Sequence, residues 1–233
     1  MTERRTARNI WSRRAAAPKV SLPERTITQV EPLKRPRGYS AVYVDGEPAL
    51  TAPTKIVAGL GLWPGRIMRP DDLQRTIAQA QEADALAQAL KLLAACDRTE
   101  MEIRRGLTRR GFPQPTIATV LDRLRDRGLI DDHRYAKEYV RTQGARRALG
   151  PAALRAKLAR VGVAPSTVDA ALAEEMTEAS QRELAEAAAR KRLSSLRKVS
   201  GVALRSRLYA FLLNRGFDYE VAAEVLEGLP ETE

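Results

Sequence analysis

The sequence is poor in the residues that most often carry metal or redox chemistry. It contains one cysteine, Cys96, and one histidine, His133, among 233 residues. A single cysteine cannot form an internal disulfide, and this pair cannot complete the four-ligand shell of a structural zinc site. We therefore expect Cys96 to pack at the end of an apolar helix and His133 to be solvated near a helix start, rather than to form a nucleophilic pair.

Long apolar runs are also missing. No stretch approaches the ~20 consecutive apolar residues that a membrane span requires. The amino terminus carries positive charge without an apolar region behind it, so a secretory signal is not expected. Hydrophobic residues still make up 44% of the chain, which is enough for a packed core. These features predict a cytoplasmic protein with no membrane partner.

The motifs of common enzyme classes are absent as well. The segment Gly59–Gly61 (GLG) lacks the third glycine and the lysine that phosphate-binding loops need. The carboxylate pairs Asp71–Asp72 and Asp131–Asp132 fall where helices are expected to start, and helix capping explains them without catalysis. We therefore expect no enzymatic activity, no cofactor and no metal.

Positive charge is abundant and gathers in blocks. The net charge is +11. Residues 1–37, 133–160 and 190–207 each carry a net charge of +7, whereas residues 161–189 carry −5. Such clustering indicates an anionic partner, which means either nucleic acid or an acidic protein surface.

The amino-terminal part differs from the rest of the chain. Residues 1–25 are rich in Arg, Ala and Ser without a sustained period, which predicts a disordered basic arm. Strands are expected at 26–30, at 39–44 and from Glu47 to Leu50, with a tight turn at Asp45-Gly46. A short helix is expected over 53–60 and a long helix from Asp71 to Ala95. The strands form a small β-meander that must pack against helices to be stable. We assign residues 26–83 to an amino-terminal extension.

From about residue 84 the chain repeats itself. Helical stretches ending at Gly111, Gly162 and Gly216 are spaced 51 and then 54 residues apart, and an apolar residue follows each glycine. A glycine at this place is typical of a helix end that needs a left-handed residue. The next helices carry matching apolar residues with i, i+3, i+4 spacing, which indicates one buried face: Ile117, Val120, Leu121; Val168, Ala171, Leu172; Ala222, Val225, Leu226.

Start signals complete these units. Thr99–Glu102 (TEME) reads as a capping box, and Gly150-Pro151 places a proline at a first helical position. Each unit then holds a first helix, a second helix ending in glycine and a third amphipathic helix. The sequence predicts an all-α array of three-helix repeats sharing a core; the boundaries are 84–130, 131–177 and 178–233. The first helices, 84–95, 131–147 and 179–194, align poorly with one another.

The join of the first two repeats carries the most specific motifs. They are Arg109–Phe112 (RRGF), Val120–Leu124 (VLDRL), Gly128–Asp132 (GLIDD), Tyr135–Arg141 (YAKEYVR) and Gly150–Arg155 (GPAALR). These motifs resemble the RecX family of RecA modulators over residues 84–229, and more loosely over 26–83. The sequence departs from the family pattern at Val161–Val163 (VGV) and in its longer, more basic amino-terminal arm.

The resemblance implies tandem three-helix units in an elongated, curved array. It also implies a monomeric regulator that binds the RecA–DNA filament and inhibits its recombinase, ATPase and coprotease activities, in DNA repair, recombination and the SOS response. The charge blocks supply the candidate contact residues for the filament or its DNA: Arg134, Lys137, Arg141, Arg146, Arg147, Arg155, Lys157, Arg160, Arg190, Lys191, Arg192, Arg197, Lys198, Arg205 and Arg207.

Two further interpretations stay open. The chain could bind DNA directly and without sequence preference, because arginine clusters on short helices suit phosphate contacts. No helix shows a compact Arg/Asn/Gln set for base readout. Tyr135 and Tyr139 could stack on bases, although their four-residue spacing favours a core stripe. A short linker is expected to bring two groups of cations near each other: Arg141, Arg146 and Arg147 at the end of one helix, and Arg155, Lys157 and Arg160 on the next.

Overall fold

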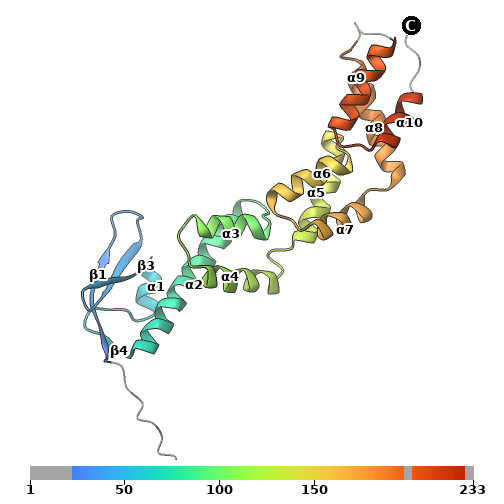
Figure 1. The fold of residues 1–233 in the computed structure, drawn as a ribbon. Helices are drawn as coiled ribbons and strands as arrows, with labels where there is room; N and C mark the ends of the chain where they lie inside the picture. Colours follow the sequence, from blue (N-terminus) through green and yellow to red (C-terminus); the bar gives the residue numbers. More distant parts are fainter. Residues whose placement is uncertain (1–22, 197–200, 229–233) are drawn as a thin grey trace, which may run out of the picture. The chain divides into compact units, whose positions relative to one another are not determined.

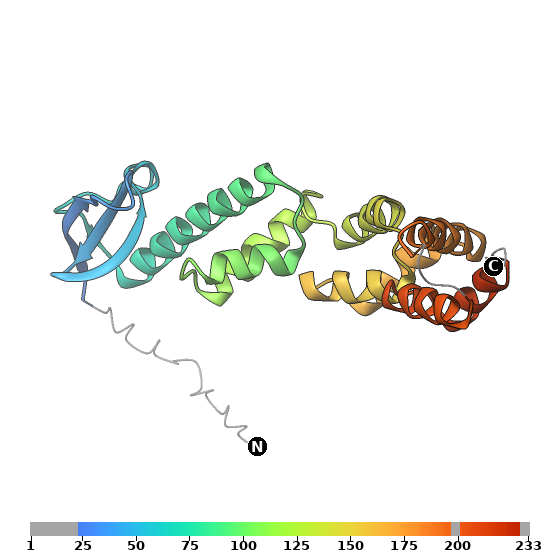
Figure 2. The ribbon, with the colours of Figure 1, turned by 90° about the horizontal axis from the view of Figure 1, so that it is seen from above.

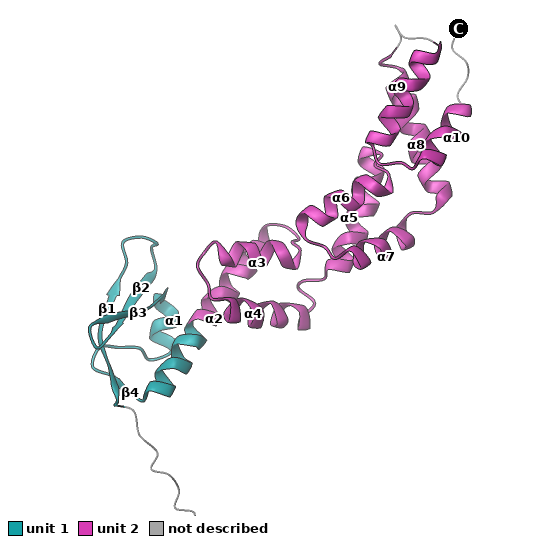
Figure 3. Ribbon diagram, viewed as in Figure 1, with its two compact units in different colours: residues 1–80 teal, residues 81–233 magenta. Residues whose placement is uncertain are grey.

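The computed structural model describes residues 23–196 and 201–228, and it divides into two compact units at residues 80 and 81 (Figure 3). Most of the predicted arm, up to residue 22, lies outside the described residues. Its last residue, Arg25, belongs to the first strand, which therefore begins one residue earlier than predicted.

The first unit is built on a four-stranded antiparallel sheet (Figure 1). Its strands are β1 (Arg25–Pro32), β2 (Tyr39–Val44), β3 (Glu47–Pro53) and β4 (Ile67–Met68), in the order β3-β2-β1-β4. The first three confirm the predicted meander. The sequence missed β4, because two residues are too few to show the alternation that marks a strand.

Helices cover the apolar face of this sheet. Helix α1 (Thr54–Gly59) and the start of α2 (Pro70–Ala95) contribute Val57 and Leu73 to a core with Ile27 and Val42. The sheet therefore packs against helices, as a sheet of this small size requires for its stability. Asp71 and Asp72 stand in the first turn of α2, where the helix dipole favours carboxylates.

The second unit is helical throughout its described secondary structure. After α2 come α3 (Glu100–Thr108), α4 (Gln114–Asp126), α5 (Asp132–Arg147), α6 (Pro151–Val161), α7 (Pro165–Glu175), α8 (Glu178–Leu193), α9 (Gly201–Asn214) and α10 (Tyr219–Glu227). The end of α2 with α3 and α4, then α5–α7 and α8–α10, form three successive triplets (Figure 2). This confirms the predicted tandem three-helix repeats with a small amino-terminal sheet.

The predicted buried faces and helix ends are confirmed. All nine apolar residues expected on the third helices are buried. Gly111, Gly162 and Gly216 have φ angles of +82°, +90° and +85°, the left-handed conformation that glycine adopts at helix ends. The sequence pattern therefore located the core of each repeat and the turn that redirects its chain.

Two close joints connect the repeats. At the first, Gly162 lies against α3, where a Cβ would come within 2.3 Å of the Met101 Cβ. The buried Thr99 hydroxyl donates a hydrogen bond to the Val161 carbonyl at 2.6 Å. The glycine of the second repeat therefore packs on the start of the second helix of the repeat before it.

The second joint has the same arrangement, but its hydrogen bonds are between backbone groups. A Cβ on Gly216 would lie 2.2 Å from the Ala153 nitrogen. The Gly150 N–H donates to the Arg215 carbonyl at 2.8 Å, and the Ala152 N–H donates to the Gly216 carbonyl at 3.1 Å. In both joints, the carbonyl of the residue before the glycine accepts a hydrogen bond from the N-cap residue of the second helix in the preceding repeat. Thr99 is this donor in the first joint, and Gly150 is in the second. This contact fixes α6 beside the end of α9.

Candidate partner-binding groove

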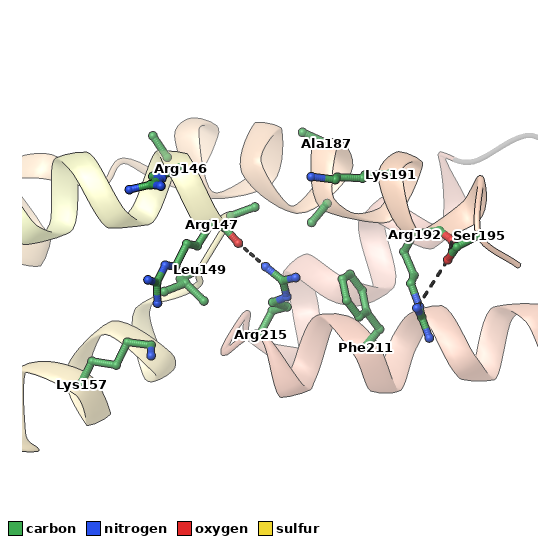
Figure 4. Close-up of a pocket in the computed structure, with 13 residues that line it drawn as sticks. Arg146, Arg147, Leu149, Lys157, Ala187, Lys191, Arg192, Ser195, Phe211 and Arg215 are labelled. Carbon is green, nitrogen blue, oxygen red and sulfur yellow. Dashed lines mark hydrogen bonds between the residues drawn. The ribbon is translucent and has the colours of Figure 1, made fainter.

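Five of the predicted contact residues come together where the second and third repeats meet. They line a groove of about 770 Å³ between the end of α5, α6, α8 and α9 (Figure 4). We call it the basic groove. Its cationic residues are Arg146, Arg147, Lys157, Lys191, Arg192 and Arg215; the other lining residues are Ala145, Ala148, Leu149, Ala187, Ala188, Ser195 and Phe211.

Helix ends position most of these cations. Arg146 and Arg147 occupy the last turn of α5, and Lys191 and Arg192 occupy the last turn of α8. Basic side chains are favoured there, because the carbonyl end of a helix carries partial negative charge. Helix α5 ends at Ala148 in a left-handed conformation with φ of +45°. The linker it opens leads into α6, which supplies Lys157.

No carboxylate among the described residues neutralises the charge of the groove. None of its thirteen described lining residues is an aspartate or glutamate. Within the described parts of the chain, none of the six cations has a carboxylate oxygen within the 4.0 Å of a salt bridge. Six like charges gathered this way produce a local positive potential that attracts anions.

Sequence reasoning missed two members of the groove, Arg215 and Phe211. The Arg215 guanidinium donates a hydrogen bond to the Arg147 carbonyl and lies 4.9 Å from the centre of the Phe211 ring. Arg192 approaches the same ring at 5.5 Å, so Phe211 lies between two guanidinium groups (Figure 4). The Arg-Gly pair at 215–216 was a usable signal, because the same pair ends the second helix of the first repeat.

Four other predicted contact residues are paired within the protein instead. Lys137 binds Glu174 at 2.7 Å, and this hydrogen bond raises the pKa of Lys137. Arg155 pairs with Asp169 at 2.8 Å. The pairs Arg141–Glu138 and Arg190–Glu186 lie on their own helices at 2.5 and 2.9 Å. Arg155 was expected near Arg146 and Arg147, but it does not line the groove with them.

The remaining predicted contact residues lie elsewhere. Arg134 donates to the Gly128 carbonyl at 3.3 Å, and Arg205 donates to the Leu226 carbonyl at 3.2 Å. Arg160 and Arg207 are exposed outside the groove. The last two predicted contacts, Arg197 and Lys198, lie outside the described residues.

The two tyrosines of α5 are part of the packing. Their ring centres are 6.2 Å apart with planes 20° from parallel, and both rings are partly buried against the core of the second repeat. Burial raises the pKa of the Tyr135 hydroxyl. These observations support the core interpretation of Tyr135 and Tyr139.

The carboxylates beside these tyrosines act as helix caps. Asp131 accepts a hydrogen bond from the Arg134 N–H at 2.9 Å, and Asp132 accepts one from the Glu100 N–H at 2.9 Å. Asp132 therefore links α5 to the start of α3 across the first joint. Burial raises the pKa of Asp132 and outweighs the hydrogen bond from Glu100.

The prediction for the lone cysteine was wrong, and the prediction for the lone histidine is confirmed. Cys96 is exposed rather than packed, and it lies just after the last residue of α2, Ala95. His133 lies in the first turn of α5 with its side chain 43% exposed, and its Nε2 lies 3.1 Å from a Glu174 carboxylate oxygen. The parts of the chain that the structure describes contain no group of three or more His, Cys, Asp or Glu able to hold a metal, and no helix long and apolar enough to cross a membrane.

The fold and the groove define a helical-repeat protein with a cationic surface between its last two repeats. Comparison with known families identifies the repeats. Three family models match, described as the first, second and third three-helix domains of RecX, over residues 85–124, 131–172 and 180–226. The chain belongs to the RecX family, which confirms the resemblance found in the sequence.

Individual relatives agree with this assignment. A "Regulatory protein RecX" of Geobacillus kaustophilus is 34% identical over 82% of this chain and 71% of its own length. Another, from Mycobacterium sp. strain KMS, is 35% identical over 63% of this chain and 81% of its own length. A crystal structure of regulatory protein RecX is similar with a TM-score of 0.64 and 28% identity, covering 87% of this chain and 99% of that one.

Proposed function

We propose that this protein regulates RecA by binding the RecA–DNA filament through the basic groove, and that it restrains ATP hydrolysis, strand exchange and repressor cleavage by the filament. The family assignment supports a regulatory role, since the relatives carry the name regulatory protein. The single observation that carries the choice of surface is the set of six cations that have no carboxylate partner among the described residues. The chain is not expected to catalyse a reaction of its own.

Physical considerations favour the groove over the other basic positions. A cation that already has a carboxylate partner, such as Arg155 or Lys137, must exchange that partner to bind a new anion. A cation without a carboxylate partner has no ion pair to break, so its pairing across an interface contributes more net affinity. Clustered charge also accelerates association with an anionic filament.

The deciding experiment measures RecA-driven ATP hydrolysis on single-stranded DNA at several ratios of this protein to RecA. We expect inhibition at concentrations below that of RecA. The double variant Arg147→Glu with Arg192→Glu should inhibit at least tenfold less potently. Its control is Arg141→Glu with Arg190→Glu, which changes the net charge equally but alters side chains paired on their own helices.

Non-specific DNA binding is the second candidate, because the same cations would suit phosphates. The two functions differ in their preferred target. Binding to bare single-stranded DNA as tight as binding to the filament would favour the second function. Unchanged hydrolysis at equal concentrations of the two proteins would argue decisively against the first.

A further inference from the structure

We infer that the basic groove binds a short acidic peptide segment of its partner protein, one that carries apolar side chains between its carboxylates. This inference rests on the proposed function and names the chemistry that the groove recognises. It follows from the composition of the groove, from the surroundings of its aromatic ring and from its size.

The groove combines apolar surface with cations. Ala187 is exposed and Phe211 is partly exposed, and arginine and lysine side chains line the same space from both repeats (Figure 4). An apolar surface of this kind gains free energy by contacting apolar side chains. A bare phosphodiester backbone offers none, whereas an acidic peptide offers carboxylates and apolar side chains together.

The only aromatic ring among the described lining residues is not available for stacking. Phe211 lies between Arg215 and Arg192, whose guanidinium carbons are 4.9 and 5.5 Å from the ring centre. Proteins that bind single strands present open aromatic faces on which bases stack, each worth about 1–3 kcal/mol. With its ring covered by guanidinium groups, the groove lacks this source of affinity for single-stranded DNA.

The size and the donors of the groove fit a short segment. Its volume of about 770 Å³ falls within the roughly 300–1,000 Å³ of clefts that enclose small ligands. A double helix is far too wide to enter such a space. Four of the six cations are arginines, whose planar donor pairs match the two oxygens of a carboxylate. Carboxylates spaced along a peptide would therefore find partners on both sides of the groove.

Site-specific photo-crosslinking of the full chain on assembled RecA–single-stranded DNA filaments tests the inference. A benzophenone amino acid replaces Ala187, an exposed lining residue of α8, or Ala170, an exposed residue of α7 outside the groove. The crosslinked products are digested with nuclease and protease and identified by mass spectrometry. We expect position 187 to label a RecA peptide with at least two carboxylates next to an apolar residue. Adding Arg147→Glu and Arg192→Glu should lower its yield at least tenfold.

Other outcomes overturn the inference. Crosslinks from position 187 to DNA, or to a RecA peptide without carboxylates, would show that the groove binds something else. Labelling from position 170 but not from 187 would show that the filament is bound through another surface. Failure of the proposed function gives a different result, because ATP hydrolysis would then be unchanged and neither position would label the filament.

Discussion

Gly111 and Gly216 form a matched pair of positions at which the strength of a repeat joint can be measured. Both end the second helix of a repeat with φ angles of +82° and +85°. An alanine at either position meets the strain of a left-handed backbone, which costs about 1–2 kcal/mol. Part of this is offset by the reduced freedom of the unfolded chain, which contributes roughly 0.4–1 kcal/mol. We therefore expect Gly111→Ala to destabilise the protein by about 1 kcal/mol.

Gly216→Ala meets a second obstacle that Gly111→Ala does not. The space around Gly111 is open to 4 Å among the described residues, but a Cβ on Gly216 would lie 2.2 Å from the Ala153 nitrogen. The start of α6 must move away, which breaks the two hydrogen bonds of Gly150 and Ala152 to the end of α9. Each contributes about 1 kcal/mol, so Gly216→Ala should cost about 3 kcal/mol in all.

Urea unfolding followed by circular dichroism measures both variants against the parent protein. In the Gly216→Ala variant, the last repeat should unfold at a lower urea concentration than in the parent protein, because repeats are stabilised by their neighbours. Valine at either glycine should cost more than 1 kcal/mol, since a branched side chain is poorly tolerated at positive φ. Equal losses for the two alanine variants would refute the close joint, and no loss at Gly111 would refute the role of that glycine at the helix end.

Three further outcomes are expected. Thr99→Val should destabilise by about 2 kcal/mol in urea unfolding, because it removes both an N-cap and the hydrogen bond to Val161, and Thr99→Ser should restore most of the loss. Burial alone would raise the pKa of Glu100, but hydrogen bonds from Arg104 and Arg125 lower it below its ordinary value of 4.5. The stability advantage of the parent over Glu100→Gln should therefore be full above about pH 4.5 and disappear as the pH falls below it, as thermal melts from pH 6 to 3 would show. Binding to the RecA filament, measured by fluorescence anisotropy, should weaken as salt rises, because surface charges are screened; salt-independent binding would contradict the role of the groove.

The architecture was predictable where its determinants are local in sequence. A glycine with an apolar successor marks each helix end, and spacing alone placed all nine third-helix residues in the core. The capping box at Thr99 formed as predicted. Strand β4 was not predictable, since two residues carry no period and exist as a strand only because β1 lies beside them.

The site was predictable as a region but not residue by residue. Charge density selected the second and third repeats, yet it could not separate Arg155, which Asp169 neutralises from 14 positions away, from Lys157 in the groove. Pairing depends on which side chains face each other across two helices. The rotation of each side chain around its helix axis decides which side chains face each other, and amino-acid composition does not contain this information.

The second joint, between the start of α6 and the end of α9, stabilises the repeats and also shapes the groove. The Arg215 guanidinium donates a hydrogen bond to the Arg147 carbonyl, and the Arg215 carbonyl accepts a hydrogen bond from the Gly150 N–H. One residue thus fixes the end of α9 to both helices that flank it in the second repeat. Since Phe211 packs against this arginine, any change that opens the joint also displaces the ring and the cations around it. Affinity for an acidic segment should therefore fall with the stability of the joint, even in variants such as Gly216→Ala that leave all six cations in place.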